Sequence, residues 1–437
     1  MRQKKFFPII VAILAIMAVA LVLGSTAGAQ VKFKTLHAFR GGADGRAPQE
    51  GLIIDSGGNL YGTTMYGGGT GCGGQGCGTV FKLTPSPDGQ WAESVLYRFT
   101  DNNGGPAAAL ISDTAGNLYG TTDGVQWAWG SVFKLAPNSD GSWTESTLWV
   151  PATTDDGYGS NSSLTLDGAG NLYGTTMWGG GGPPWSGGVV FRLSPNPDGS
   201  WAYSKLYVFQ GNPDGRLPIH DGVILDASGN LYGQTAYGGE LYPIDAGTIY
   251  MLVPNSDGTW TETVLYRFEK GMDGVNPDSN LIFGPDGSLY GTTYRGFGNG
   301  CNDPGYADGT GCGMVCRMTL QPDGSWEKTT IHGFTGRDGG NPVGRVIFDS
   351  AGNLYGTTFH GGDMTCGTEN PSLGCGTVYK LTPEPDGSWS RQVLHVFHSR
   401  GGSHAVGGLV LDGAGSLYGS TQGDGVTTFG SVFEITP

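Results

Sequence analysis

The chain has 437 residues, among them 82 glycines, and a formal net charge of −15 at pH 7. This acidic balance, without any run of Lys or Arg, repels a phosphate backbone and excludes nucleic acid as a partner. The glycines recur at fixed places beside apolar β-forming residues, so they indicate the turns of a folded repeat rather than a low-complexity chain.

Residues 1–29 have the pattern of a signal peptide. Basic residues Arg2, Lys4 and Lys5 precede a long apolar run, and small residues precede Gln30. This order is typical of a segment that directs export and is then removed, although an uncleaved membrane anchor would begin in the same way. We therefore expect a secreted, periplasmic or cell-surface protein that has no membrane span once the segment is cleaved.

One phrase, Gly-Asn-Leu-Tyr-Gly-Thr-Thr, occurs seven times with small variations. Its tyrosines are Tyr61, Tyr119, Tyr173, Tyr232, Tyr290, Tyr355 and Tyr418. A recurrence every 54 to 65 residues marks a repeat architecture. Seven sheet-like units of this size can close into a ring.

Each repeat contains four short β-patterned segments. In the second repeat they are residues 109–113, 117–122, 131–135 and 143–150. The first two segments and the last two are each joined by a tight turn, so neighbouring strands run antiparallel, as in a propeller blade. The first segments are continuously apolar, which predicts inner strands buried on both faces.

A tryptophan begins the fourth segment in six repeats. These residues are Trp91, Trp143, Trp201, Trp260, Trp326 and Trp389. An aromatic residue repeated at one position is typical of a core, so we expect the tryptophans to pack blade against blade.

The two ends of the chain complete one blade. Val31–Phe39 has the pattern of a fourth strand, and Ser431–Pro437 has that of a third. Pairing them would remove the exposed edges of an open array. The sequence thus predicts one all-β domain over residues 30–437. We expect a monomeric seven-bladed β-propeller with four antiparallel strands per blade, whose last blade is closed by the N-terminal strand.

The repeat resembles that of the GloVer-type (choice-of-anchor) family of exported bacterial tandem-repeat proteins. The resemblance covers the mature chain and rests on phrases such as residues 51–55, 58–64 and 78–85. It implies a secreted or surface protein and carries over no activity or catalytic residue. Family members vary in their C-terminal anchor, whereas this chain ends with its last blade.

The connections between strands are unequal on the two faces of the predicted ring. The first-to-second and third-to-fourth turns share one face and are short and uniform. The second-to-third and blade-to-blade connections share the other face, which we call the variable face. Variable loops on a rigid scaffold are where function tends to lie.

The residue two positions after Thr-Thr enters the variable face in each repeat. Five of these residues are candidate ligand-binding groups, namely Tyr66, Trp178, Tyr237, Arg295 and His360. Trp127, Trp129 and Trp185 lie deeper in the same loops. Accessible aromatic rings beside acidic and amide groups suit stacking on sugar rings. Alternatively, the rings pin glycine-rich loops onto the blades.

A second group of residues stands at the predicted mouth of the central channel. Glu50, Asp221, Asn280 and Arg345 occur where the inner strands begin. Their oxygens could hold Ca²⁺, or the group could supply a general acid and base. The third alternative is solvated loop charge. The repeated Asp-x-x-Gly-Asn phrase lacks the ligand series of a calcium loop and predicts a turn in which the aspartate accepts from nearby backbone N–H groups.

Six of the seven cysteines fall in pairs within single second-to-third loops. The pairs are Cys72 with Cys77, Cys301 with Cys312, and Cys366 with Cys375. Export favours disulfides, so we expect three local bridges rather than zinc sites. Cys316 takes the place of Phe81 of the first repeat and is expected to be a buried free thiol. His37, His332 and His395 replace a strand tyrosine, which predicts a structural role for them.

The sequence favours a binding or surface-interaction protein over an enzyme, because no convincing catalytic set is present. The ligand would be an extracellular glycan or a surface protein bound at the variable face, without a cofactor. The first alternative is a polysaccharide lyase or hydrolase, or a Ca²⁺-dependent lactonase-like enzyme. Its weak catalytic candidates are Glu50, Asp221, Asn280, Arg345 and His360. The second alternative is a purely structural envelope protein.

Overall fold

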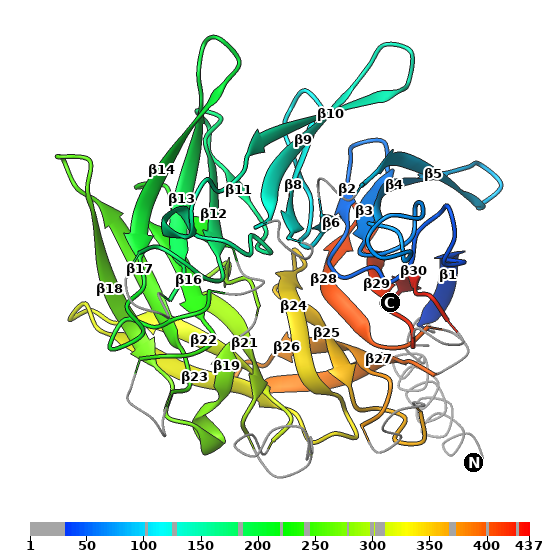
Figure 1. Cartoon of the computed structure of the whole chain (residues 1–437). Coiled ribbons are helices and arrows are strands. Elements are labelled where there is room, and N and C mark those ends of the chain that lie inside the picture. The colour runs from blue at the N-terminus through cyan, green and yellow to red at the C-terminus, as the bar shows by residue number, and fades with distance from the viewer. Residues whose placement is uncertain are drawn as a thin grey trace, which may run out of the picture.

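The computed structural model describes residues 31–100, 104–124, 129–181, 187–218, 222–239, 245–277, 279–297, 301, 311–366, 373–398, 402–424 and 428–437. These residues form seven antiparallel sheets arranged as blades around a common centre (Figure 1). The protein is therefore a seven-bladed β-propeller, as predicted. Two 3₁₀ turns, η1 (Thr154–Asp156) and η2 (Gly271–Asp273), accompany the described strands. No helix in this described part is long and apolar enough to cross a bilayer.

Blades 1 to 4 follow one another along the chain, and their strands are given from the centre outward. Blade 1 consists of β2 (Ile53–Ile54), β3 (Leu60–Thr64), β4 (Thr79–Pro85) and β5 (Trp91–Arg98). Blade 2 consists of β6 (Gly105–Pro106) and β7 (Ile111–Ser112), both beside β8 (Leu118–Asp123), then β9 (Ser131–Pro137) and β10 (Trp143–Trp149). Blade 3 consists of β11 (Thr165–Leu166), β12 (Leu172–Thr176), β13 (Val189–Pro195) and β14 (Trp201–Val208). Blade 4 consists of β15 (Ile224–Leu225), β16 (Leu231–Thr235), β17 (Thr248–Pro254) and β18 (Trp260–Arg267).

Blades 5 to 7 complete the ring. Blade 5 consists of β19 (Val275–Pro277) and β20 (Ile282–Phe283), both beside β21 (Leu289–Arg295), then β22 (Met314–Leu320) and β23 (Trp326–Gly333). Blade 6 consists of β24 (Gly340–Phe348), β25 (Leu354–His360), β26 (Thr377–Pro383) and β27 (Trp389–Val396). Blade 7 consists of β28 (Ala405–Leu411), β29 (Leu417–Thr421), β30 (Ser431–Thr436) and β1 (Lys32–Ala38).

Blade 7 is built from both ends of the chain. Strand β1 pairs antiparallel with β30, and the two lie side by side in Figure 1. Phe33 of β1 stacks on His395 of blade 6, with ring centroids 3.8 Å apart, and on Phe433 of blade 7 at 5.8 Å. The predicted pairing of Val31–Phe39 with Ser431–Thr436 is confirmed. It covers the edge that β30 would otherwise expose.

An aspartate closes the first turn of each blade. In blade 1, Asp55 accepts from the backbone N–H groups of Gly57 and Asn59, each at 2.9 Å, and from the Tyr61 hydroxyl, also at 2.9 Å. Burial and the bond to Asp55 raise the pKa of Tyr61 above its ordinary value. The tyrosine-to-aspartate bond recurs in the other six blades, from Tyr119, Tyr173, Tyr232, Tyr290, Tyr355 and Tyr418. The repeated phrase therefore forms a side-chain-capped turn, as predicted.

The repeated tyrosines and tryptophans meet between neighbouring blades. Tyr61 of blade 1 packs edge-on against Trp143 of blade 2, with ring centroids 6.4 Å apart. Trp91 of blade 1 meets Tyr418 of blade 7 at 5.9 Å, across the closure of the ring. Equivalent pairs are Tyr119 with Trp201, Tyr232 with Trp326, and Tyr290 with Trp389. These contacts confirm that the tryptophans pack blade against blade.

In five blades, the residue at the first position of the Thr-Thr pair links its blade to the next one. Thr357 of blade 6 donates from its hydroxyl to the Gly407 carbonyl of blade 7 at 3.1 Å. Equivalent bonds run from Thr121 to Ser162, from Thr175 to Pro218, and from Ser420 to Glu50. Gln234 takes the threonine position in blade 4 and donates to the Ser279 carbonyl. The bond from Ser420 to Glu50 joins blade 7 to blade 1, so this set of bonds also spans the closure.

One prediction about the inner strands is wrong in part, because they are not buried on both faces. Leu52 is buried, but Ile53 and Ile54 are only half-buried, and Ile53 lines the central cavity described below. An apolar run therefore also builds the wall of the cavity. The inner strands of blades 6 and 7 are longer than the others and carry bulges between Val343 and Ile347 and between Val406 and Val410.

A blade-to-blade connection places two carboxyl groups close together between blades 3 and 4. Asp214 accepts from the Tyr207 hydroxyl at 2.7 Å, and Glu262 of β18 faces it with one oxygen lacking a hydrogen-bond partner in the described part. Burial, then the negative charge of Asp214, raise the pKa of Glu262 to about 7, which Arg267 partly offsets. One blade further on, Lys328 holds the same position and forms an ion pair with Asp273.

We expect Glu262→Gln to remove a pH dependence of stability. The folded protein keeps a proton on Glu262 that the unfolded chain has lost, so the wild type loses stability as pH rises from about 5 to 7. At pH 8 the variant should be more stable by about 1–2 kcal/mol, a figure reduced because the side chain is partly exposed. At pH 4.5 the two proteins should be nearly equal. Chemical denaturation at each pH measures the difference.

The control for this prediction is Glu327→Gln, the same substitution at an exposed glutamate of β23. It should leave the pH dependence of the wild type unchanged. A Glu262→Gln protein that loses stability across the same pH range as the wild type would contradict the prediction.

Candidate functional site

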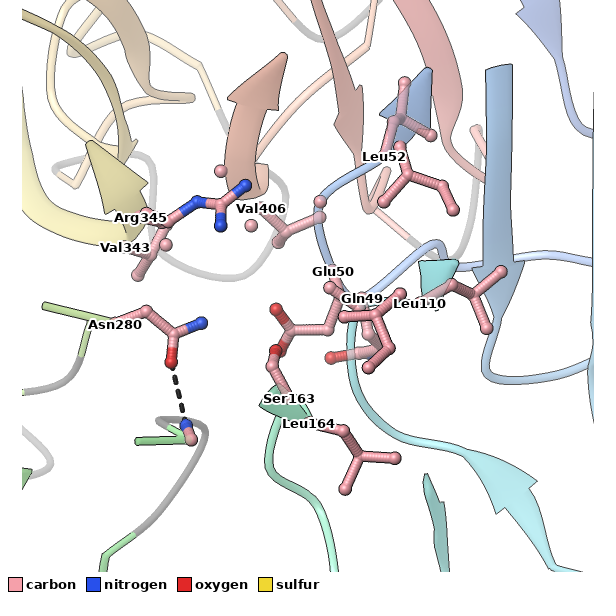
Figure 2. A pocket seen from close by; sticks show the side chains of 18 of the residues that line it. Gln49, Glu50, Leu52, Leu110, Ser163, Leu164, Asn280, Val343, Arg345 and Val406 are labelled. Atoms are coloured by element: carbon pink, nitrogen blue, oxygen red, sulfur yellow. Dashed lines mark hydrogen bonds between the residues drawn. The ribbon is translucent and has the colours of Figure 1, made fainter. Parts of the chain in front are cut away.

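A cavity of about 640 Å³ occupies the centre of the ring and is lined by residues of all seven blades. Its wall includes the starts of the inner strands and the first residues after the Thr-Thr pairs. Both groups belong to connections of the variable face, so the cavity lies at that end of the channel. Figure 2 shows side chains from several blades pointing into this one space.

Three of the four residues predicted at the channel mouth line this cavity. Glu50, Asn280 and Arg345 come from blades 1, 5 and 6 and point into it from different sides (Figure 2). Asn280 Oδ1 accepts from the Gly222 backbone N–H at 2.8 Å, which fixes the amide. The fourth residue, Asp221, lies outside the described residues.

The second threonine of each pair fixes the five predicted ligand-binding residues. In blade 4, Thr235 donates to the Tyr237 carbonyl at 3.0 Å. Equivalent bonds run from Thr64 to Tyr66, Thr176 to Trp178, Thr293 to Arg295, and Thr358 to His360. Each of these positions therefore has its backbone held against the blade, whichever side chain it carries.

Only two of these five side chains reach the central cavity. Tyr237 and Arg295 line it, and Arg295 is buried beside the Tyr294 ring at 5.3 Å. The Arg216 guanidinium lies over Tyr237 at 5.2 Å and forms an ion pair with Asp245.

The other three predicted residues pack outside the cavity. The backbone of Tyr66 forms an antiparallel β-bridge with Arg46, and the Arg46 guanidinium lies 5.1 Å from the centre of the Tyr66 ring. The backbone of Trp178 forms the equivalent β-bridge with Tyr158. The alternative in which aromatic rings pin the loops thus describes Tyr66 and Trp178. Of the deeper tryptophans, Trp129 packs on Tyr158 with ring centroids 6.3 Å apart, whereas Trp127 and Trp185 lie outside the described residues.

His360 stands beside the cavity rather than in its wall. Its Nδ1 donates to Asn341 Oδ1 at 3.0 Å, and the Asn341 amide donates in turn to the Tyr294 carbonyl. The imidazole also packs against Phe359 and His404, with ring centroids 4.7 and 5.6 Å away. These contacts hold the ring in one orientation.

Sequence reasoning missed two of the three aromatic residues that line the described wall of the cavity. Tyr294 and Phe359 directly follow Thr-Thr, one position before the predicted residues. Alternate residues of a strand point to the same side, so the residue directly after Thr-Thr points to the same side as the first threonine, which reaches toward the next blade. This alternation was the signal in the sequence that could have identified Tyr294 and Phe359. Gln49, Asn276 and Gln422 add amide groups to the wall.

Arg345 lines the cavity without the carboxylate partner that several other arginines have. Arg216, Arg317 and Arg391 each lie within 4 Å of an aspartate oxygen. Arg345 forms no hydrogen bond or ion pair with the part of the chain that the structure describes. Its side chain is exposed to the solvent of the cavity, and partial desolvation by the cavity wall lowers the pKa of the guanidinium from its usual value.

All three predicted disulfides are present in the second-to-third loops. They join Cys72 to Cys77, Cys301 to Cys312, and Cys366 to Cys375. Loops of this length gain about 2–3 kcal/mol from cross-linking in the chain-entropy account. Cys316 is a buried free thiol, as predicted, and burial raises its pKa to about 11.

The predicted structural histidines also have packing or polar partners. His332 lies 2.9 Å from Asp338, His37 lies 3.7 Å from Asp44, and His395 stacks on Phe33. Among the described residues no three His, Cys, Asp or Glu side chains converge as metal ligands. Glu50 is the single carboxylate among the described cavity residues, so Ca²⁺ stays a sequence-based expectation.

The fold and the cavity define a seven-bladed β-propeller with a polar and aromatic pocket at its variable face. The repeat pattern of the Gloeobacter/Verrucomicrobia repeat family matches residues 22–144 and 123–303, which together are more than half of the chain. The protein belongs to this family. No curated protein matches the chain.

Solved propeller structures resemble the chain only distantly. PorZ, a surface component of the type-IX secretion system of Porphyromonas gingivalis, has a TM-score of 0.49 at 13% identity over 88% of this chain and 46% of that one. The chain thus spans about half the length of PorZ. PhoX of Pseudomonas fluorescens has a TM-score of 0.46 at 13% identity, and a luciferin-regenerating enzyme 0.44 at 11%, each over 93% of this chain and 95% of the other.

Proposed function

We propose that the protein is an exported, non-catalytic binding protein that takes a glycan into the central cavity. One observation carries the proposal: a single cavity at the variable face brings together aromatic rings and polar side chains from different blades. Tyr237, Tyr294 and Phe359 offer flat apolar surfaces for sugar rings, and Asn276, Asn280 and Gln422 offer amide groups for hydroxyls.

The three disulfides support the exported location in this proposal. Disulfides persist in oxidising compartments such as the periplasm or the cell surface. Each bridge closes a loop of the variable face, so it would hold that face in shape outside the cell.

A glycan array with the chain from Gln30 onward tests the proposed function, followed by titration with the best oligosaccharide. Replacing Tyr294 by Ala should weaken binding about 5- to 10-fold, because a stacked aromatic ring contributes about 1 kcal/mol. The matched control is Trp178→Ala, which removes an aromatic side chain of the same face outside the cavity. Binding that depends on Trp178 but not on Tyr294 would contradict the site. Binding of no saccharide at all would contradict the function.

The second candidate is a polysaccharide lyase or hydrolase, or a lactonase-like enzyme, that acts in the same cavity. It is favoured by Glu50, whose carboxylate faces the cavity together with Arg345. Glycoside hydrolysis usually needs a second carboxyl group, and the predicted partner Asp221 lies outside the described residues. Polysaccharide cleavage by the wild type, assayed with and without a chelator, that Glu50→Gln abolishes would establish this candidate instead.

A further inference from the structure

The strongest clue to the kind of glycan is Arg345, which lines the cavity together with Arg295. The chain as a whole is acidic, with a formal net charge of −15, yet the guanidinium of Arg345 meets no carboxylate in the described part of the ring. The side chain of Arg345 is exposed to the solvent of the cavity, so its charge stays accessible to a ligand. A guanidinium in this position can bind an anion that comes from outside the chain.

The backbone around Arg345 is shaped to present this side chain. Arg345 lies in the bulge of β24, between Val343 and Ile347, where the pairing with β25 is interrupted. A Cβ at Gly408 of blade 7 would lie only 3.1 Å from Arg345 Cβ, so the absence of a side chain there makes room for the arginine. From this bulge the side chain of Arg345 extends into the cavity (Figure 2).

Further donors face the same space. The Oδ1 atom of Asn280 is occupied by the Gly222 N–H, so the amide nitrogen is left to point into the cavity (Figure 2). Ser163, which also lines the cavity, is buried, and its hydroxyl has no hydrogen-bond partner among the described residues. A planar guanidinium and an amide are the groups that bind a carboxylate well.

The rest of the wall narrows the class of anion. The described wall carries the positive charges of Arg295 and Arg345 and the negative charge of Glu50, so it favours a ligand with one negative charge over phosphate or citrate. The same carboxylate can accept hydrogen bonds from hydroxyl groups. The aromatic rings of Tyr294 and Phe359 suit a ring-shaped ligand. A sugar ring with hydroxyls and a single carboxylate satisfies all three conditions.

We propose that the cavity binds a uronic acid residue of an acidic polysaccharide, with its carboxylate held by Arg345 and Asn280. This inference rests on the proposed glycan-binding function and names the sugar class. The ring of the sugar lies against Tyr294 or Phe359, and its hydroxyls donate to Glu50. No bond is made or broken in this binding.

The experiment compares acidic oligosaccharides with their own methyl esters by titration calorimetry. The probes are trimers of galacturonate, glucuronate and mannuronate, each as the free acid and as the methyl ester, and a neutral glucose trimer. The protein is the full chain from Gln30 onward. At least one free acid should bind the wild type about 10- to 100-fold more tightly than its ester, because a charge-assisted pair is lost on esterification. Added NaCl should reduce this difference.

The Arg345→Gln protein should bind the free acid and the methyl ester equally, with the affinity that the wild type has for the ester. The Arg345→Lys protein should keep part of the preference for the acid. The control is Arg337→Gln, an exposed arginine outside the cavity, which should keep the full preference. Thermal unfolding of each variant confirms that the fold is intact, and Arg345, without partners in the described chain, should not affect it.

The possible outcomes separate the two proposals. Equal affinity of the wild type for acids and esters, or an acid preference that survives in Arg345→Gln, would overturn the uronate site while leaving a glycan-binding protein. Binding of no saccharide, acidic or neutral, would overturn both proposals. If a folded Arg345→Gln protein bound neither the acids nor the esters, the role assigned to Arg345 would also be overturned, because that role is to hold the carboxylate of the sugar alone.

Discussion

A chain that starts at Phe39 instead of Gln30 should fail to form a stable ring. The truncation removes β1 and leaves the whole edge of β30 without backbone partners. It also removes Phe33, which stacks on His395 and Phe433 and joins blade 6 to blade 7. Loss of the half-buried Phe33 ring costs about 1–3 kcal/mol, and each lost ladder bond about 1 kcal/mol more. Over the whole strand the sum is comparable with the usual stability of a domain, about 5–15 kcal/mol.

Near-ultraviolet circular dichroism with thermal unfolding measures this effect, and size-exclusion chromatography detects association through the exposed edge. The chain from Gln30 serves as the control and should unfold cooperatively. A synthetic peptide of residues 31–39 should restore part of the lost stability, because β1 is held only by non-covalent contacts with β30 and its neighbours. An unchanged midpoint in the truncated chain would show that the ring does not depend on this strand.

We also expect a large loss of stability for Gly407→Ala in the inner strand of blade 7. A Cβ at this position would lie 2.0 Å from the Gly51 nitrogen and 2.3 Å from the Glu50 carbonyl carbon, both backbone atoms of blade 1. Backbone cannot move aside as a flexible side chain can. In addition, Gly407 has a φ of +65°, which favours glycine. We expect a loss of at least about 4 kcal/mol in the free energy of unfolding.

Gly413→Ala is the matched control, because it lies in the same blade and a Cβ there would meet nothing within 4 Å. It should change the free energy of unfolding by less than about 0.5 kcal/mol. Urea denaturation of the two variants compares them directly. Equal stability of Gly407→Ala and the wild type would mean that blades 7 and 1 do not approach as closely as described.

The architecture was predictable because its signals are local and repeated. The tyrosine of each repeat bonds to an aspartate six residues earlier in most blades, as Tyr61 does to Asp55, so one short phrase carries both a strand and its turn. The cysteine pairs lie within single loops, and the pairing of Cys72 with Cys77 needed no knowledge of the distant chain. The strand patterns at the two ends likewise sufficed to predict the closure.

The cavity was only partly predictable because its wall depends on contacts between blades. Tyr66 and Tyr237 occupy the same position of the repeat and are held by the same threonine bond, yet only Tyr237 lines the cavity. The difference arises from packing around the centre, which the sequence of one repeat does not contain. Arg345 was found because a charge at the start of an inner strand stands out. Phe359 was missed because an aromatic residue at a strand end also suits an ordinary core.

The hydrogen bond from the second threonine to the carbonyl two residues later affects how the ligand specificity of the protein can change by mutation. Since Thr235 fixes the carbonyl of Tyr237 and not its side chain, mutation of that residue need not disturb the backbone around it. Selection could therefore alter one contact group at a time while the scaffold keeps its shape. Relatives that share this frame could recognise different ligands, and an engineer could diversify the five positions held in this way in a library without redesigning the protein.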